Sequence, residues 1–341
     1  MKLLAETQDY VHGGTQRDEY TADEVVEVLC PLCGSDRSHL LYVEHRVIGI
    51  AQCNDCSLIY TNPRLPAPEQ IYWGDSALYY EEARLIFEGR MPHHRDPNYR
   101  REIESIAQHK PEGRFLDVGC NIGMLLRLAM NRGWDVVGLE PSPSLASLAK
   151  KHGFEVYNCF LHEVPDRENG SFDVVAFSDV FEHISEPLPF LREAARLLKD
   201  DGVLYVKVPN AKWSIFKQKM LALIGRQPDQ GLWDAYEHVV HYTQSTLIRM
   251  LEEGGFRVLN LSTESPVHTP NWHEFVGHYY QYPTPWFMDI RRKAVREVCY
   301  HLSGIERLLR LGSLGYLAQN IVVIASKRLN KTPAESFDGH Q

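Results

Sequence analysis

Four of the seven cysteines form two Cys-x-x-Cys pairs whose spacing is typical of a metal site. The pairs are Cys30 with Cys33 and Cys53 with Cys56, and residues 34–52 separate them. Each pair can turn two thiolates to one side, so that two pairs close a tetrahedron around Zn²⁺. Because cysteine occupies all four positions, no coordination position is left for a reactive water. The pattern therefore predicts a structural zinc rather than a catalytic one.

A second candidate site is the stretch RFLDVGCNIG at residues 114–123, where an apolar run leads into two glycines and then a helix-like sequence. A dinucleotide-binding turn needs GxGxxG, but Asn121 and Met124 stand where the second and third glycines would be. The Gly-Lys-Ser/Thr ending of a P-loop is also missing from this stretch. The turn is therefore expected to hold a ligand that approaches the backbone closely without bringing a pyrophosphate.

The elements that must position this turn alternate between strand and helix from residue 113 onward. The expected strands are FLDVG, WDVVGLE, EVYNC, FDVVAFSDV and GVLYVKVP, with helices GMLLRLAMNRG, PSLASLAKKHG and LPFLREAARLLKDDG among them. Such alternation predicts a parallel sheet flanked by helices. Ligands of these sheets bind beyond the carboxyl ends of the strands, which places residues 117–123, Glu140 and residues 178–183 at one rim.

The cysteine pairs lie among short apolar runs typical of strands, so they predict a zinc ribbon. The proposed division of the chain is an extension at 1–24, a zinc ribbon at 25–66, an aromatic-rich linker or lid at 67–98, a core domain at 99–328 and a tail at 329–341. A helical insertion at about 270–315 is expected to serve core packing or a dimer contact.

Charge and hydropathy exclude several classes of protein. The 36 basic and 45 acidic residues give a net charge of −9, which argues against a broad nucleic-acid-binding surface. No apolar run approaches the roughly 18 residues of a membrane span, and the first residues lack the apolar region of a secretory signal. A soluble, cytoplasmic protein is expected.

The motif DVGCNIG resembles the first motif of class I S-adenosylmethionine-dependent methyltransferases, which looks like DVGCGxG and is matched here except at Asn121. Further segments resemble that family in its own order: FDVVAFSDVFEHI, LLKDDGVLYVKVPN, HYTQSTLIRMLEEGGFRV and AQNIVVIASK. A zinc ribbon ahead of such a core is similar to bacterial methyltransferases of deoxysugar and other small-molecule pathways. The resemblance implies an α/β fold, with a Rossmann-like class I methyltransferase sheet and a small N-terminal zinc-ribbon module.

The same resemblance implies S-adenosylmethionine as cofactor. In the family the glycine turn lies against the methionyl part, and an acidic residue that ends the next strand binds both ribose hydroxyls. Glu140 occupies that position, and a carboxylate can accept two hydrogen bonds from a cis-diol. The expected cofactor-binding residues are Asp117, Gly119, Cys120, Asn121, Gly123, Glu140, Pro141, Ser178 and Asp179.

Candidates for the acceptor side follow the fourth expected strand, where the family's acceptor faces the methyl group. His183 could take a proton near neutral pH with Glu182 orienting it, the alternative being a packing or loop-capping role. In related sugar C-methyltransferases a Tyr and Glu-His stretch contributes to the acceptor site, and Tyr236 and His238 resemble it. Thr243 is expected to cap the helix that follows.

Several alternatives stay open. Asp179, Glu182 and His183 could bind a second, divalent cation, as a similar motif does in quinone-biosynthesis O-methyltransferases. The leading function is methyl transfer to a small polar metabolite such as a sugar nucleotide. Its rivals are an rRNA methyltransferase whose zinc module holds RNA and a non-catalytic, cofactor-binding scaffold. The acceptor atom and the oligomeric state are left open by these patterns.

Overall fold

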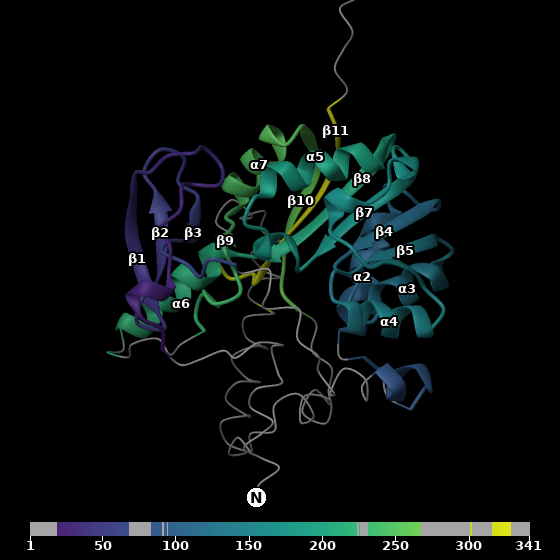
Figure 1. Ribbon diagram of the computed structural model, residues 1–341, viewed down its shortest axis with the longest axis horizontal. Coiled ribbons are helices and arrows are strands. Elements are labelled where there is room, and N and C mark those ends of the chain that lie inside the picture. The colour runs from purple at the N-terminus through teal and green to yellow at the C-terminus, as the bar shows by residue number, and fades with distance from the viewer. Residues whose placement is uncertain are drawn as a thin grey trace, which may run out of the picture.

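The computed structural model describes residues 19–67, 83–90, 92–93, 95–223, 225, 231–266, 301 and 316–328. The strands of these residues form a four-stranded sheet and a seven-stranded sheet, which Figure 1 shows side by side. Most of the extension, the lid and the insertion expected from the sequence, and the whole of the tail, lie outside the described residues.

The seven-stranded sheet has the order β10-β11-β8-β7-β4-β5-β6. Its strands are β4 (Arg114–Val118), β5 (Asp135–Leu139), β6 (Glu155–Tyr157), β7 (Phe172–Ser178), β8 (Leu198–Pro209), β10 (Phe256–Glu264) and β11 (Asn320–Lys327). The helices around it are α2 (Asp96–Ala107), α3 (Met124–Arg132), α4 (Pro143–Lys151), α5 (Pro187–Leu197) and α7 (Gln244–Glu253). The smaller sheet has the order β1-β2-β3-β9, from β1 (Ser38–Glu44), β2 (Ile48–Cys53), β3 (Ile59–Thr61) and β9 (Val240–His241), with α6 (Ala211–Leu223) beside it.

The alternation of strand and helix expected from the sequence is confirmed for all five core strands. Strands β6, β5, β4, β7 and β8 are parallel, so their carboxyl ends meet at one rim. The sheet as a whole is mixed rather than parallel, because β11 pairs antiparallel with β8 and β10 pairs antiparallel with β11. Strand β11 enters from the end at which β8 leaves, as the pairing of Asn320 with Pro209 shows.

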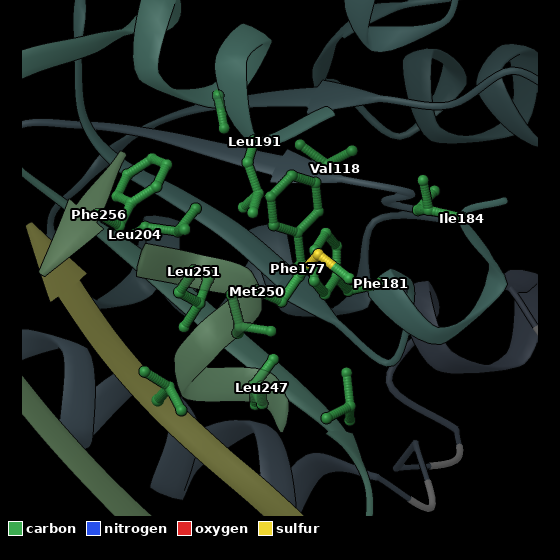
Figure 2. Close-up of a cluster of buried hydrophobic side chains, with 14 of the residues drawn as sticks. Val118, Phe177, Phe181, Ile184, Leu191, Leu204, Leu247, Met250, Leu251 and Phe256 are labelled. Carbon is green, nitrogen blue, oxygen red and sulfur yellow. The ribbon is translucent and has the colours of Figure 1, made fainter. Parts of the chain in front are cut away.

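Both faces of this sheet are covered, which explains why its strands read as nearly continuous apolar runs. Neighbouring residues of one strand point to opposite faces: Phe115 packs with side chains of α2 and α3, and Leu116 belongs to the cluster beneath α5 and α7. Figure 2 shows part of that second cluster, where Phe177 and Phe181 lie against Met250 and Leu191.

Local signals set the ends of the helices that frame the rim. Gly123 and Gly133 flank α3 with φ of 88° and 110°, a left-handed conformation that suits glycine. Thr243 caps α7 as expected, since its Oγ1 accepts a hydrogen bond from the Thr246 amide at 3.3 Å. Helix α2 begins at Asp96 and carries a proline, Pro97, in its first turn. Among the described helices, none has the length and apolar character needed to cross a membrane.

Candidate functional site

The turn after β4 binds back onto the neighbouring strand. The amides of Gly119 and Cys120 both donate to the carbonyl of Leu139, at 2.7 and 3.0 Å. Gly119 has φ of 74°, and a Cβ on it would lie 2.7 Å from a methyl group of Val180. Glycine is therefore required here both by the backbone conformation and by the closeness of the next loop.

Asn121 stands where the related motif has a glycine, and its conformation explains why asparagine is tolerated. Its φ is 50°, in the left-handed region that asparagine visits more readily than most residues. Its Oδ1 accepts a hydrogen bond from the amide of Ile122 at 2.7 Å, which stabilises the turn locally. The substitution thus preserves the turn geometry.

Glu140 follows β5, and its side chain connects the glycine turn after β4 with the turn after β5. Its side chain is 6 % exposed, and its two oxygens accept the amides of Asn121 and Ser142, each at 2.9 Å. Burial raises the pKa of Glu140, while the two amide donors lower it. A carboxylate offers about four lone-pair positions, so each oxygen keeps one for a further donor. The backbone of Glu140 and Pro141 is held by Asn158, whose Nδ2 donates to both carbonyls at 2.9 Å.

Asp117 is the residue before the last of β4 and its carboxyl is near that of Glu140. Its side chain is 3 % exposed, and no hydrogen bond reaches it within the part of the chain that the structure describes. Burial raises the pKa of Asp117 well above its usual range, and the negative charges of Glu102 and Glu140 add to the rise. The rim is therefore a place where a positively charged ligand would lower the electrostatic free energy.

The two remaining turn residues expected to bind cofactor are Cys120 and Gly123, and both are closely packed against neighbouring residues. Cys120 is buried, and its Sγ faces Gly138 of β5 so closely that a Cβ there would lie 2.5 Å away. Gly123 leaves room for the ring of Phe154, which would be 2.6 Å from a Cβ. The Cys120 side chain thus packs against the sheet, so only its backbone can contribute to the turn.

Ser178 and Asp179, at the end of β7, belong to a buried charge network. Ser178 donates to Glu102 of α2 at 2.6 Å, and Lys207 of β8 lies 2.6 Å from Glu102 and 2.9 Å from Asp179. Arg95 forms a second ion pair with Asp179. Two cationic side chains therefore already neutralise the Asp179 carboxylate.

A cluster of Glu182, His183 and His238 lies just beyond β7. Glu182 and His183 are in a 3-10 helix (Phe181–His183), and His238 comes from the segment before β9. The His183 and His238 rings meet edge to face with centroids 4.8 Å apart. Potential ligand atoms of all three residues lie within 4.8 Å of one another. The cation alternative weighed for Asp179, Glu182 and His183 is thus corrected: His238 takes the place of Asp179, which is engaged by Lys207.

The orienting partner of His183 also differs from the expected one. Its Nδ1 lies 3.0 Å from the backbone carbonyl of Glu237, which can only accept, so Nδ1 carries the proton. The proton-accepting lone pair of the neutral ring is then on Nε2. Glu182 Oε1 is 3.9 Å from Nε2, beyond hydrogen-bond distance. The Glu237 carbonyl, rather than Glu182, therefore sets the tautomer.

Burial keeps this cluster uncharged near neutral pH. It lowers the pKa of His183 to about 3, with the neighbouring His238 adding to the effect. It lowers the pKa of His238 to about 4 and raises the pKa of Glu182 to about 8. At pH 7 the structure accordingly presents two neutral imidazoles and a protonated carboxyl.

The described ring contacts of Tyr236 are with residues other than His183 and His238. It is 6 % exposed and packs in an apolar cluster with Tyr20, whose ring it stacks on at 6.0 Å, and with His45 at 6.3 Å. Its expected role at an acceptor site stays a prediction, because the described contacts of its ring are with residues near the smaller sheet.

The four paired cysteines converge as expected. Cys30 and Cys56 have sulfurs 3.4 Å apart, those of Cys33 and Cys53 are 3.5 Å apart, and all four lie within 4.8 Å of one another. Tetrahedral zinc with Zn–S bonds of about 2.3 Å separates its sulfurs by roughly 3.8 Å. Burial raises the pKa of Cys30 to about 11 and that of Cys56 above its usual range, so thiolates here need a compensating cation. The cluster is compatible with a zinc module.

A sequence model of a family described as a methyltransferase domain matches residues 91–261, half of the chain. The chain belongs to this methyltransferase family. The match spans the glycine turn, Glu140 and the cluster beyond β7. It also contains α2 and α7, which cover the two faces of the sheet.

Two relatives similar in sequence are also named methyltransferases. The methyltransferase is 32 % identical over 120 residues to a ubiquinone biosynthesis O-methyltransferase of Rhodopseudomonas palustris, covering 33 % of this chain and 46 % of the relative. It is 28 % identical over 157 residues to one of Coxiella burnetii, covering 43 % and 64 %. The chain thus spans between about half and two thirds of these relatives. A SAM-dependent methyltransferase structure from Archaeoglobus fulgidus aligns with TM-score 0.45 and 17 % identity, covering 72 % and 99 %.

The rim of the methyltransferase fits the cofactor that the sequence resemblance implies. S-adenosylmethionine carries a sulfonium and an ammonium group, and a cation beside the turn would favour the ionised forms of the buried Asp117 and Glu140 carboxyls, whose pKa values are raised by burial. Each Glu140 oxygen has a lone pair left for a ribose hydroxyl. The residues present at the rim are therefore suited to the charge and to the diol of this group.

Sequence reasoning missed three residues that shape the rim. Lys207, Glu102 and Arg95 form the network around Asp179, yet none was among the expected site residues. One signal was available, since Lys207 interrupts the apolar strand GVLYVKVP and buried lysines are rare unless paired. Glu102 and Arg95 carry no comparable signal, because α2 precedes the core strands and its contacts depend on the fold.

Replacing Glu182 with glutamine should flatten the pH dependence of stability above pH 6.5. In the folded methyltransferase Glu182 keeps its proton up to a pKa of about 8, whereas the unfolded chain loses it near 4.5. The folded state binds more protons in this interval, so the free energy of unfolding falls as pH rises through it. The buried histidines act in the opposite direction only below their unfolded pKa of 6.5.

Between pH 6.5 and pH 8 the wild type should therefore lose at most about 2 kcal/mol of stability from Glu182, at about 1.4 kcal/mol per pH unit. Urea unfolding at both pH values measures this loss. The exposed Glu186, replaced with glutamine, is the matched control and should keep the wild-type slope. An unchanged slope in E182Q would refute the assignment of a protonated Glu182.

Proposed function

We propose that this methyltransferase transfers the methyl group of S-adenosylmethionine to a small polar metabolite, a sugar nucleotide or a related biosynthetic intermediate. The carrying observation is the Glu140 carboxylate, which is bound to the turn amide of Asn121 and retains acceptor capacity for a diol. Membership of the methyltransferase family supports the reaction type. The net charge of −9 favours a small acceptor over RNA.

The chain's own residues would align and deprotonate the acceptor. The sulfonium of the bound donor supplies an electrophilic methyl group. An acceptor oxygen or nitrogen that gains a methyl group becomes strongly acidic, so even a weak base can take its proton late in the reaction. His183 Nε2 is such a base, because Nδ1 is committed to the Glu237 carbonyl and burial keeps the ring neutral. His238, edge to face with His183, would line the same pocket.

A second candidate is methylation of an oxygen on an acceptor of the kind that the relatives' names indicate. Both relatives are named ubiquinone biosynthesis O-methyltransferases. The cluster of Glu182, His183 and His238 has the donor types and spacing for a divalent cation that would hold such an oxygen. Dependence of turnover on added Mg²⁺ or Mn²⁺ would distinguish this candidate from the base mechanism.

We also propose that the four cysteines hold a structural zinc and form a ribbon module with β1, β2 and β3. The convergence of four sulfurs and the absence of another ligand type in the cluster support this role. Residues 67–98 would act as a linker or lid and residues 99–328 as the methyltransferase domain. The protein would work in the cytoplasm.

The test of the proposed function is a turnover screen. Purified protein with S-adenosylmethionine is incubated separately with sugar nucleotides, phenolic and quinone precursors, and ribosomal RNA, and release of S-adenosylhomocysteine is measured. Turnover with a small metabolite is expected. Turnover with RNA alone would contradict the proposal, and tight cofactor binding without turnover on any acceptor would favour a scaffold protein.

Replacing His183 with alanine should lower kcat on the identified acceptor by about 100-fold or more, the usual effect of removing a general base. The affinity for S-adenosylmethionine should stay within about twofold, because His183 has no described contact with the glycine turn. The exposed His162, replaced with alanine, is the control for loss of an imidazole. Equal kcat for H183A and H162A would refute the role of His183 as base.

A further inference from the structure

We propose that the cysteine module, which consists of the four paired cysteines with β1, β2 and β3, positions the acceptor side of the methyltransferase site. The acceptor side comprises His183 and His238, and the module acts on it through two buried residues, Thr61 and Glu44. Together they grip the segment 233–241, which carries His238 and the carbonyl that orients His183. The proposal rests on the proposed function in taking these histidines as acceptor-site residues. Figure 1 shows the arrangement, with β9, the edge strand of the smaller sheet, on the side that faces the methyltransferase core.

Thr61, the last residue of β3, binds three residues of that segment. It is fully buried, and its amide donates to the carbonyl of Val239 at 3.0 Å. Its Oγ1 donates to the carbonyl of His238 at 2.7 Å and lies 3.1 Å from Nε2 of His241. A hydroxyl has one proton, so Nε2 of His241 must carry a proton and donate to Oγ1.

Glu44, the last residue of β1, binds the other end of the segment. It is 3 % exposed, and its two carboxylate oxygens accept the amides of Trp233 at 2.9 Å and Ala235 at 2.8 Å. Hydrogen bonds to an ionised acceptor are among the stronger ones in proteins. The segment is therefore fixed by the module at both ends, and His238 belongs to the end held by Thr61.

The same segment also forms hydrogen bonds with Glu182 and His183 on the acceptor side. The amide of Val239 donates to the carbonyl of Glu182 at 3.0 Å, and the carbonyl of Glu237 accepts from His183 Nδ1. One face of the segment thus contacts the module, and its other polar groups hold the two residues beyond β7. A shift of the segment would move His238 and change the orientation of the His183 ring together.

The four-cysteine cluster is directly connected to β3, the strand that carries Thr61. Strand β3 begins three residues after Cys56, and the amide of Cys53 donates to the carbonyl of Leu58 at 2.9 Å. Strand β3 then pairs with β9, with Tyr60 opposite Val240. Leu58 and Tyr60 belong to one apolar cluster with Val240, the core of the large sheet and three of the four paired cysteines, Cys30, Cys53 and Cys56. The module is therefore continuous with the site rather than an appended domain.

Hydrogen–deuterium exchange of the zinc-loaded full chain tests this inference without requiring turnover. In T61V the amides of residues 233–241 should exchange at least about tenfold faster, while those of β7 keep their protection. T61S retains the hydroxyl and should restore the protection. E44Q should loosen the Trp233 end selectively, and the control Gln52→Ala, whose side-chain contact stays within the module, should match the wild type.

Kinetics and binding provide the second readout. T61V should raise KM for the acceptor about tenfold while zinc content and the affinity for S-adenosylmethionine stay unchanged, and T61S should recover the wild-type KM. Equal exchange of residues 233–241 in T61V and Gln52→Ala would overturn the inference, as would equal loss in T61S and T61V. Faster exchange in T61V with no acceptor turned over by the wild type would instead uphold the positioning and refute the proposed function.

Discussion

Replacing Glu140 with alanine is expected to weaken the binding of S-adenosylmethionine by at least about 100-fold. The carboxylate would accept two ribose hydroxyls, and a hydrogen bond to a charged group contributes about 1.5–3 kcal/mol. Two such bonds exceed the roughly 2.8 kcal/mol that corresponds to a factor of 100. The variant also leaves the amides of Asn121 and Ser142 without their acceptor, which would loosen the glycine turn.

Isothermal titration calorimetry measures the change in affinity. E140Q keeps one amide oxygen as acceptor and should fall between the wild type and E140A. Glu155 is an exposed glutamate at the start of the neighbouring strand β6, and E155A should bind as the wild type does. Wild-type affinity in E140A would show that the cofactor does not lie against this carboxylate.

Replacing Cys56 with serine is expected to abolish stoichiometric zinc binding and to unfold the cysteine module. Structural zinc contributes about 10–16 kcal/mol to the folding of small zinc peptides, more than the stability of a typical small domain. The buried sulfur of Cys30 would then lose the cation that lets it lie as a thiolate, because burial raises the pKa of Cys30 to about 11. The loss should extend to segment 233–241, because β3 holds it.

Elemental analysis gives the zinc content per chain, and limited proteolysis reports the module's folding. Wild type should bind one zinc, and C56S none, with new cleavage between residues 30 and 61. The half-buried Cys159 lies outside the cluster, so C159S is the matched control for loss of a thiol. One equivalent of zinc in C56S would contradict a four-cysteine site.

The elements of the fold and the position of the glycine turn could be predicted from the sequence. Strand β4, the glycine turn and α3 form one continuous stretch, so short-range periodicity and the glycines at 119, 123 and 133 define them together. Glu140 could be placed because it ends the next strand, and parallel strands end at the same rim. The paired cysteines were recognisable because each pair is local and the two pairs have a regular spacing.

The acceptor side was decided by the tertiary structure. His183 and His238 were each candidates, but only the packing of β9 against β3 shows that their rings meet and that the Glu237 carbonyl orients His183. No local pattern could predict the ion pair of Asp179 with Lys207. The same holds for the contacts of Thr61 with His238 and His241, which lie 177 and 180 positions further along the chain. Periodicity and capping act over a few residues, whereas these contacts depend on how two sheets are joined. The sequence therefore determined the elements and the cofactor turn of this protein, and the way its two sheets join determined the protonation and orientation of the acceptor-side histidines.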